Sequence, residues 1–471
     1  MLLRKRVPEV IVNNRINAIK KSISTFAIAA LLLTGSAPYF AFAQTENDAG
    51  RGTEVKSLAT YDDSKVPQVG GASAILMSAE NGDIIYEKNA HVVREPASVT
   101  KILNLLVVLD HLDMDQEVTI PEGTETRGST SDLETGERMT VRDLVYCMML
   151  ESGNDAAEVL GELAGGDLKT FAKMMNEKAK ECGATATNYK NPNGLNEVAD
   201  QLNYTTAYDQ AVITREVMKN DTFREVVSST TYTIPKTNKS KARKLRNTNA
   251  CLWKLETLEM NGKQRVYKYE GCTGVKTGYT SSAGDCFVGT AKRGNLELIA
   301  VTLRSTDYAN RFGDAIKLWD YGFDHYKNYT AVKADKKLCE QKGRRGALAE
   351  VRIGTAEDLD ITMDIDYADA DGITTKIKLN EEKPTAPISK GQALGTISAY
   401  DAAGDLVAYR GLVALEKVEK GGPLSYIGIP DEYLGEVFFL FALVVGTLLV
   451  IVILLRILGR KKRNRKKGWP G

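Results

Sequence analysis

The chain has 471 residues, and its 62 Lys and Arg nearly balance 61 Asp and Glu, which gives a formal net charge of +1. With 43% apolar and 26% charged residues, the composition is that of an ordinary globular protein, so fibrous, collagen-like and broadly disordered classes are excluded. The balanced charge gives no reason to expect nucleic acid as a partner. Because the chain is too long for one compact core, we expect two folded domains with extensions.

The first 43 residues have the pattern of an export signal. A basic stretch precedes the apolar run 26–33, and Ala41-Phe42-Ala43 follows as a small-x-small cleavage site. We therefore predict a signal peptide over 1–43. Residues 44–70 are polar and rich in turn formers, which predicts a flexible tether between the cleavage site and the fold.

A β-hairpin and a buried helix are predicted next. Ala72–Met77 and Ile84–Tyr86 are apolar runs on either side of Asn81-Gly82, a preferred pair for a tight hairpin turn. The segment Ile102–Leu109 is apolar on most sides, which predicts a helix inside the domain. Ser98 lies at the start of this helix.

The remainder of this first domain alternates helical and strand patterns. Its predicted elements are a helical stretch from Val141 to about Cys182 broken at Gly165-Gly166, a loop at Asn191–Gly194, paired antiparallel strands at Cys286–Ala291 and Leu296–Leu303, and a helix over about Arg311–Tyr321. Strands at both ends with helices between them predict an α+β fold over residues 71–330, with one antiparallel sheet and helices packed on its faces.

Residues 331–420 have a different texture. Short alternating runs such as Ile361–Ile365 are separated by turn signals at Asp371-Gly372 and Ala403-Gly404, which predicts a small all-β domain. Residues 421–436 are predicted to link this domain to the last segment.

The last segment is apolar and then basic. Val437–Leu455 contains 19 residues without a charge, long enough to cross about 30 Å of hydrocarbon at roughly 1.5 Å per residue. A cluster of Lys and Arg follows directly. Since the positive-inside rule keeps such a cluster in the cytoplasm, we predict a transmembrane helix over 437–458, a basic cytoplasmic tail over 459–471, and a single-pass cell-membrane protein whose folded domains lie on the extracellular face.

Six cysteines permit up to three disulfides in an exported chain, and their spacing selects none of the 15 possible pairings. Cys147 lies in the apolar stretch 144–150, where a buried inert thiol is at least as plausible as a bridge. No pair of cysteines has metal-ligand spacing with a histidine nearby. We therefore expect no zinc or other metal, and no cofactor.

The motif Ser98-Val-Thr-Lys101 supplies a nucleophile and a base. A serine hydroxyl is a weak nucleophile until a base takes its proton, and a lysine three residues later lies one helical turn on, on the same face. Lys101 must be neutral to be that base, although an exposed lysine has a pKa of about 10.4. Burial lowers a lysine pKa, and so does a second cation nearby, for which Lys276 is the natural candidate.

Two further motifs, Ser152-Gly153-Asn154 and Lys276-Thr277-Gly278, complete the predicted site. Ser152 would pass a proton between the Lys101 amine and the leaving group, and Asn154 would bond both to the substrate amide and to Lys101. Lys276 would stay charged and hold an anionic group of the substrate.

The third motif is predicted to lie on an edge strand, because an exposed edge can pair with a peptide backbone and Gly278 permits close approach. The backbone amides of Ser98 and Tyr279 are the candidates that would hold the oxyanion. These residues together predict a serine acyl-transferase that acts on a peptide-like substrate.

With the flanking segments Glu95-Pro96-Ala97, Asn191–Leu195 and Asn247-Thr248-Asn249, the three motifs resemble the signatures of the low-molecular-weight penicillin-binding proteins, the serine D-alanyl-D-alanine carboxypeptidases of peptidoglycan biosynthesis. The resemblance runs from about residue 55 to residue 420. It implies a β-lactamase/transpeptidase-like catalytic domain, with residues 331–420 as the family's second domain. The family usually ends in an interfacial amphipathic helix, whereas this chain ends in a segment that looks fully spanning.

The resemblance also implies roles and partners. Ser98 would be the acylated nucleophile, Lys101 the proton acceptor, Ser152 the proton shuttle and Lys276 the carboxylate binder, with Arg311 as a further cation near the site. The substrate would be the D-Ala-D-Ala end of peptidoglycan stem pentapeptides, and β-lactam antibiotics would acylate the same serine.

Three alternatives remain open. A serine β-lactamase shares the motifs but needs a carboxylate that activates the deacylating water; no Glu-x-x-Leu-Asn pattern occurs between Ser152 and Lys276, and the nearest approach, Glu197 to Asn203, has the wrong spacing. A non-catalytic, wall-binding membrane protein would require a disabled site. Transpeptidase or endopeptidase action would use the same acyl-enzyme.

Overall fold

The computed structural model describes residues 57–58, 65–124, 127–195, 202–367, 372–381 and 383–465, with side chains described as far as residue 460. The predicted signal peptide, most of the predicted tether and the end of the basic tail lie outside the described residues, as does Glu197.

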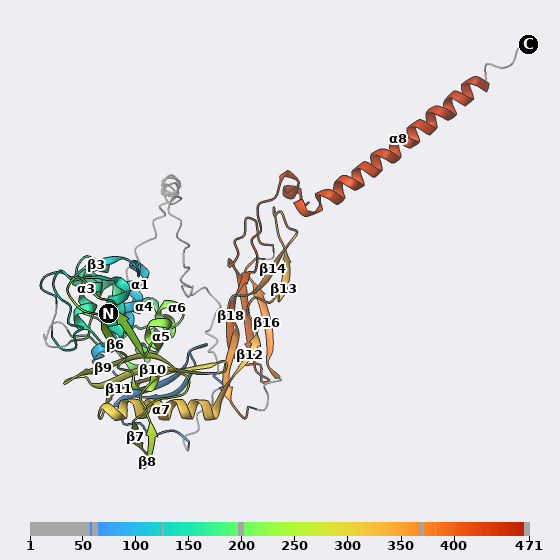
Figure 1. Cartoon of the computed structure of the whole chain (residues 1–471). Helices are drawn as coiled ribbons and strands as arrows, with labels where there is room; N and C mark the ends of the chain where they lie inside the picture. The colour runs from blue at the N-terminus through green and yellow to red at the C-terminus, as the bar shows by residue number, and fades with distance from the viewer. Residues whose placement is uncertain are drawn as a thin grey trace, which may run out of the picture. The chain divides into compact units, whose positions relative to one another are not determined.

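A five-stranded antiparallel sheet forms the centre of the first domain, in the order β2-β1-β11-β10-β9 (Figure 1). The predicted hairpin at its start and the predicted strand pair at its end are both confirmed, and β9 lies at the edge of the sheet, as predicted. The strands are β1 (Ser73–Ser78), β2 (Ile84–Lys88), β9 (Cys272–Thr280), β10 (Gly284–Arg293) and β11 (Leu296–Ser305).

Helices cover both faces of this sheet. Successive residues of a strand point to opposite faces, so each strand contributes side chains to both layers. In β1, Ile75 and Met77 pack into the cluster that contains most of the helices, whereas Ala74 and Leu76 pack against the cluster built on α7 (Tyr308–His325). Figure 1 shows α7 along one side of the sheet and the other helices across from it. The predicted α+β architecture is therefore confirmed.

The predicted helices are present, although the one over 141–182 needs a correction, and α5 and α6 were not predicted. The stretch 141–182 was predicted to break only at Gly165-Gly166, but it also breaks at residues 151–153, between α2 and α3. Ser152 has a φ of +67° there, and a left-handed residue cannot continue a right-handed helix. The helices are α1 (Lys101–His111), α2 (Val141–Leu150), α3 (Asn154–Gly165), α4 (Leu168–Glu181), α5 (Ala207–Val217) and α6 (Asp221–Ser228), with the short 3-10 helices η1 (Ala97–Thr100) and η3 (Ala250–Leu252).

The helix α7 is longer than the predicted span 311–321. It begins earlier because the side chain of Asp307 accepts hydrogen bonds from the backbone N–H groups of Ala309 and Asn310, which caps the first turn. Small two-stranded ribbons surround this core: β3 (Glu117–Thr119) with β4 (Arg138–Thr140), β5 (Thr231–Ile234) with β6 (Arg243–Arg246), and β7 (Thr257–Met260) with β8 (Lys263–Val266).

The second domain is all β, as predicted. Its sheet has the order β13-β14-β18-β17-β16, and β12 pairs separately with β15. Because β12 begins at Tyr326, β structure starts a few residues before the predicted boundary at 331. The strands are β12 (Tyr326–Val332), β13 (Cys339–Lys342), β14 (Glu350–Thr355), β15 (Leu359–Asp364), β16 (Thr374–Leu379), β17 (Ala393–Tyr400) and β18 (Leu406–Ala414).

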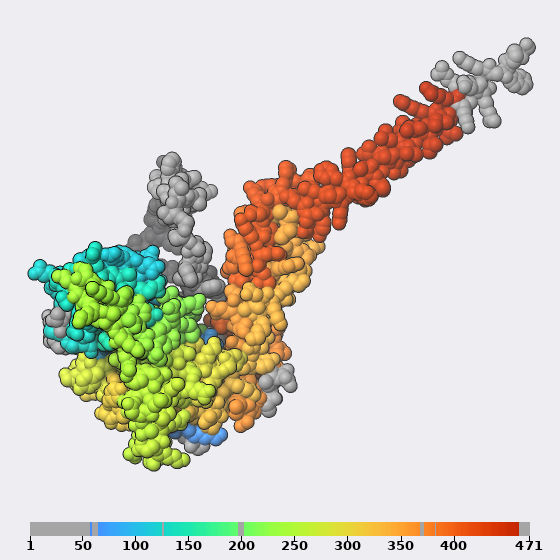
Figure 2. Space-filling view, in the orientation of Figure 1, coloured from blue at the N-terminus to red at the C-terminus, as the bar shows by residue number. Residues whose placement is uncertain are grey.

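The predicted linker contains two short 3-10 helices, η5 (Pro423–Ile427) and η6 (Asp431–Tyr433), and leads into the long helix α8 (Leu434–Arg465). The segment 431–460 is long and apolar enough to cross a membrane, and its most apolar window has none of its residues buried. Figure 2 shows α8 as a rod with its side chains uncovered.

Candidate active site

The first motif lies where η1 passes into α1. Ser98 is in η1, Lys101 is the first residue of α1, and the Lys101 Nζ lies 3.0 Å from the Ser98 Oγ. The Lys101 side chain is fully buried, whereas Ser98 is half-buried and reaches the surface of a cavity. The structure thus brings this serine and lysine together as the motif predicts.

Two oxygen atoms hold the Lys101 amine on its other sides. The Asn154 Oδ1 and the backbone carbonyl oxygen of Asn193 each lie 2.7 Å from Nζ. Burial, and then the charge of Lys276, keep the pKa of Lys101 well below its ordinary value. A buried amine with a lowered pKa is what a general base at this position requires.

The second motif lies in the break between α2 and α3. The left-handed conformation of Ser152 turns its side chain into the cavity, and Asn154 begins α3. The Asn154 Nδ2 donates to the carbonyl oxygen of Arg127 at 2.8 Å, which fixes the amide so that Oδ1 faces Lys101. Because this nitrogen carries two N–H groups, its second N–H is left for the predicted donation to the substrate amide.

The third motif lies on the edge strand β9. Lys276 is fully buried, and its Nζ donates to the carbonyl oxygen of Thr277 at 3.1 Å. Burial, and then the charge of Arg311, lower the pKa of Lys276 to about 7. Burial thus lowers the pKa of both lysines, and Lys276 is less firmly protonated than the prediction supposed.

Gly278 allows β9 to pass directly beside the nucleophile. A Cβ added at this glycine would lie 2.9 Å from the Ser98 backbone nitrogen and 3.1 Å from the Val99 nitrogen, closer than Cβ atoms normally approach backbone. The next residue, Tyr279, is 63% exposed. The strand edge and the start of the helix therefore face each other with no side chain between them.

Arg311, from α7, closes the end of the site. Its Nη1 lies 3.0 Å from the Asp285 carboxylate and donates to the Gly278 carbonyl oxygen at 3.3 Å. Arg311 is thus attached to the third motif and still contributes to the cavity wall.

A cavity of about 400 Å³ joins these residues. Lys101, Asn154 and Lys276 lie behind its wall, where their amine and amide groups support the residues in front. The lining residues are Ser98, Ser129, Ser152, Arg246, Asn247, Thr248, Trp253, Thr277, Gly278, Tyr279, Tyr308 and Arg311.

Sequence reasoning missed Ser129, Arg246, Trp253 and Tyr308 as lining residues. One signal was available, because Arg246 directly precedes Asn247-Thr248-Asn249, which resembles the family pattern. The others come from segments with no motif. A smaller hollow of about 200 Å³ lies in the β domain, and its lining contains none of the motif residues.

The six cysteines are all free thiols, so the structure contains none of the permitted disulfides. Cys147 is fully buried, and burial raises its pKa to about 12. The interpretation of Cys147 as a buried, unreactive thiol fits this environment.

Each of the two domains matches a family of known proteins. Residues 60–307 match the family model of the D-alanyl-D-alanine carboxypeptidases of peptidase family S11, and residues 326–420 match the model of the penicillin-binding protein 5 C-terminal domain. All three motifs lie within the first match.

Individual relatives align over most of the chain. The D-alanyl-D-alanine carboxypeptidase DacF of Bacillus subtilis is 31% identical over 415 residues, which cover 87% of this chain and 97% of the relative. DacC of Escherichia coli is 29% identical over 405 residues, 83% of this chain and 92% of the relative. The crystal structure of penicillin-binding protein 5 from Haemophilus influenzae superposes with a TM-score of 0.58 at 26% identity, over 75% of this chain and 99% of that one.

Proposed function

Because the chain belongs to the serine-type D-alanyl-D-alanine carboxypeptidases of peptidase family S11, we propose that it removes the terminal D-alanine from peptidoglycan stem pentapeptides through an acyl-enzyme on Ser98. The first domain is a mixed α/β transpeptidase-like domain, and the second is the family's all-β domain. The observation that carries the proposal is the buried Lys101 amine 3.0 Å from the Ser98 hydroxyl.

The lowered pKa of Lys101 favours a neutral amine, and its three contacts can accommodate one. A neutral amine has two N–H groups and one lone pair. The Asn154 Oδ1 and the Asn193 carbonyl oxygen can only accept, so they take the two N–H groups. The remaining lone pair faces the Ser98 hydroxyl, which can donate its proton along this contact. Lys101 is therefore held in the orientation that a base needs.

The reaction then proceeds by acyl transfer. The Ser98 oxygen attacks the carbonyl carbon of the penultimate D-alanine while Lys101 takes the hydroxyl proton. The backbone N–H groups of Ser98 and Tyr279 stabilise the oxyanion. The peptide bond breaks, the leaving D-alanine nitrogen takes a proton through Ser152, and water hydrolyses the ester to regenerate Ser98. A β-lactam acylates the same oxygen as its ring opens.

We expect the terminal carboxylate of the substrate to bind at the cationic end of the active-site cavity, the cleft. Lys276 and Arg311 both lie at this end, and a carboxylate that arrives there favours the charged form of Lys276. Thr277 lines the same cavity, with its hydroxyl 2.8 Å from the hydroxyl of Thr248. This arrangement supports recognition of a free chain end rather than an internal peptide bond.

We also propose that α8 anchors the chain in the cell membrane as a single span. Its apolar length and the basic residues that follow support an orientation with the catalytic domain on the extracellular face and the tail in the cytoplasm. Such an orientation places the cleft on the same side of the membrane as peptidoglycan.

Mass spectrometry of the full chain in detergent tests this function. We expect D-alanine release from diacetyl-Lys-D-Ala-D-Ala and a penicilloyl adduct on the wild type, and neither on Ser98→Ala. Wild-type protein that takes up no penicillin would favour a non-catalytic wall-binding protein instead. Rapid turnover of nitrocefin would favour the β-lactamase, and transfer of the acyl group to an added amine acceptor would indicate transpeptidation.

A further inference from the structure

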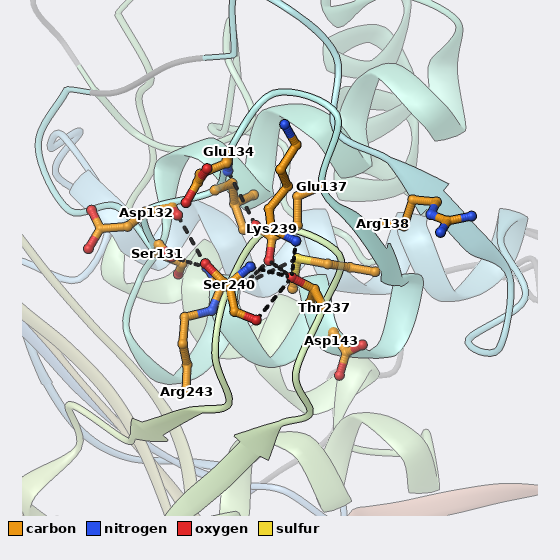
Figure 3. A network of polar contacts seen from close by, with 12 residues as sticks. Ser131, Asp132, Glu134, Glu137, Arg138, Asp143, Thr237, Lys239, Ser240 and Arg243 are labelled. Carbon is orange, nitrogen blue, oxygen red and sulfur yellow. Dashed lines mark hydrogen bonds and ion pairs between the residues drawn. The ribbon is translucent and has the colours of Figure 1, made fainter.

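A buried ion pair lies beside the cleft, outside the three motifs. Glu137 precedes β4 and is fully buried, and its Oε1 lies 2.8 Å from the Nη2 of Arg243, the first residue of β6. Figure 3 shows these two side chains within a network of polar contacts. The Thr237 hydroxyl donates to the same Glu137 oxygen at 2.7 Å, so the carboxylate holds the connection between β5 and β6 as well as the start of β6.

Arg243 also holds the loop before Glu137. Its Nη1 donates to the carbonyl oxygens of Ser131 and Asp132, each at 3.2 Å. One guanidinium therefore bonds to the carboxylate and to two loop carbonyls at the same time. The planar fork of arginine suits this task, whereas a lysine ammonium has no such fork.

The loop that Arg243 holds is the one that fixes Asn154. The Arg127 carbonyl oxygen accepts from the Asn154 side chain at 2.8 Å, and the Ser129 carbonyl oxygen accepts from its backbone N–H at 2.7 Å. Gly128, between them, has a φ of +70°, and a Cβ there would lie 2.8 Å from the Asn154 Nδ2. Asn154 in turn contacts Lys101.

Strand β6, which Arg243 begins, also leads to the opposite wall of the cleft. Three residues after Arg243, Arg246 begins the lining segment that continues through Asn247 and Thr248. The Thr248 hydroxyl lies 2.8 Å from the hydroxyl of Thr277 on β9. β6 thus contacts the loop that holds Asn154 at one end and leads to the third motif at the other.

We propose that the Glu137–Arg243 pair is a positioning device that sets the separation of the two cleft walls and thereby the placement of Asn154 against Lys101. Neither residue is among those that line the active-site cavity. A buried ion pair contributes little net stability compared with apolar residues of the same volume, because desolvation offsets the attraction, so its effect here is on geometry. This inference rests on the proposed acyl-enzyme.

Stopped-flow acylation of the full chain by a fluorescent penicillin tests the inference, since it separates the dissociation constant of the first complex from the acylation rate constant. We expect Arg243→Gln to lower the acylation rate constant about 10-fold to 100-fold, the effect of a small misplacement of reacting groups. The dissociation constant should change less than about threefold. Arg243→Lys should fall between the wild type and Arg243→Gln, because it keeps the ion pair but not both loop contacts.

The double variant Glu137→Gln/Arg243→Gln separates positioning from stability. Removing both charges leaves no unpaired buried ion, so its melting temperature should recover toward the wild type while its acylation rate constant stays low. Recovery of both would overturn the inference. Glu297→Gln is the matched control, because Glu297 is a buried carboxylate paired with Arg224 at 2.8 Å.

Glu297→Gln should lower the melting temperature and leave the acylation rate constant within about threefold of the wild type. An equal loss in Glu297→Gln and Arg243→Gln would mean that any buried pair has this effect, and would contradict positioning by Glu137 and Arg243. Failure of the proposed function is distinguishable, because in that case the wild type itself would take up no penicillin.

Discussion

The cleft and the turn between β1 and β2, residues 79–83, both contain charged groups whose pKa values are shifted by burial. In the cleft the groups are cations, Lys101, Lys276 and Arg311, and burial lowers the pKa of each. In the turn they are acids, and burial raises the pKa of Glu80 to about 7 and that of Asp83 to about 6. The same physical cause acts on opposite charges in the two regions.

The difference lies in what surrounds the shifted groups. Around the turn, protein groups supply the partners: the Glu80 carboxylate accepts from the Glu297 backbone N–H at 2.9 Å, and Arg215 and Arg410 donate to the Glu80 carbonyl oxygen. In the cleft, the cations stand at or behind the wall of an open cavity. We therefore take a shifted pKa to indicate a functional site where the group lies at or directly behind the wall of a cavity that a ligand can enter.

The largest effect that would test this comparison is expected from Lys101→Ala. Loss of the base should slow acylation of Ser98 by penicillin about 10²- to 10⁴-fold, the range for general bases, while circular dichroism shows a folded protein. Lys101→Arg should not restore the rate, because a guanidinium stays charged. A fast-reacting Lys101→Ala variant would show that the shifted amine is only structural, like the acids of the turn.

Lys276→Ala should have the next largest effect, on substrate binding. Loss of a charge-assisted contact to the terminal carboxylate corresponds to about 1.5–3 kcal/mol, or roughly 10- to 150-fold in KM. A peptide whose terminal carboxylate is amidated should bind the variant and the wild type alike. Equal losses with both peptides would mean that Lys276 does not bind the carboxylate.

The pKa of Lys276 also predicts a pH dependence. Since only the charged form attracts a carboxylate and the pKa is about 7, affinity for the free-acid peptide should fall as the pH rises from 6 to 8. The amidated peptide serves as the control and should show no such fall. A constant affinity for the free acid across this range would contradict the assignment.

Gly278→Ala tests the steric side of the cleft. The added Cβ would lie 2.9 Å from the Ser98 nitrogen, so β9 must move away from the nucleophile. Overpacking of this kind costs about 1–3 kcal/mol, and we expect acylation to slow by about tenfold. Gly294→Ala is the matched control, because an added Cβ there meets nothing within 4 Å, although its φ of +60° adds local strain. Equal acylation in both variants would argue against close approach at Gly278.

Sequence reasoning succeeded where partners are close in the chain. Ser98 and Lys101 lie three residues apart at the start of one helix, so their contact follows from helical geometry. The edge position of β9 was also predictable, from the chemistry of its motif. The break at Ser152 was not, because a left-handed serine leaves no mark in the composition.

Contacts between distant segments were beyond prediction for a different reason. The Asn193 and Arg127 oxygens that orient Lys101 and Asn154 are backbone carbonyls, which every residue has. Glu137 and Arg243 lie 106 residues apart, and a chain with this many charges offers no rule for choosing such a pair. Local motifs therefore predict the reacting groups, whereas the residues that hold those groups in place can be identified only from the three-dimensional structure.

The smallest effect on acylation is expected in the turn, from Glu80→Gln, which should change stability instead. The folded chain binds the Glu80 proton more tightly than the unfolded chain, because the pKa is raised from 4.5 to about 7. The stability from this group is thus complete below about pH 4.5 and is lost as the pH rises through about 7. Glutamine keeps the acceptor for the Glu297 N–H but does not titrate, so the variant should gain roughly 1–3 kcal/mol over the wild type between pH 5 and pH 8.

Urea unfolding at several pH values measures this gain, with Glu87→Gln as the exposed control that should show none. The acylation rate constant of Glu80→Gln should match that of the wild type at every pH, because Glu80 is not among the residues that line the active-site cavity. If instead the variant changed the pH profile of acylation, the turn would be coupled to the cleft. In that case access to a cavity would no longer separate the functional charges from the structural ones.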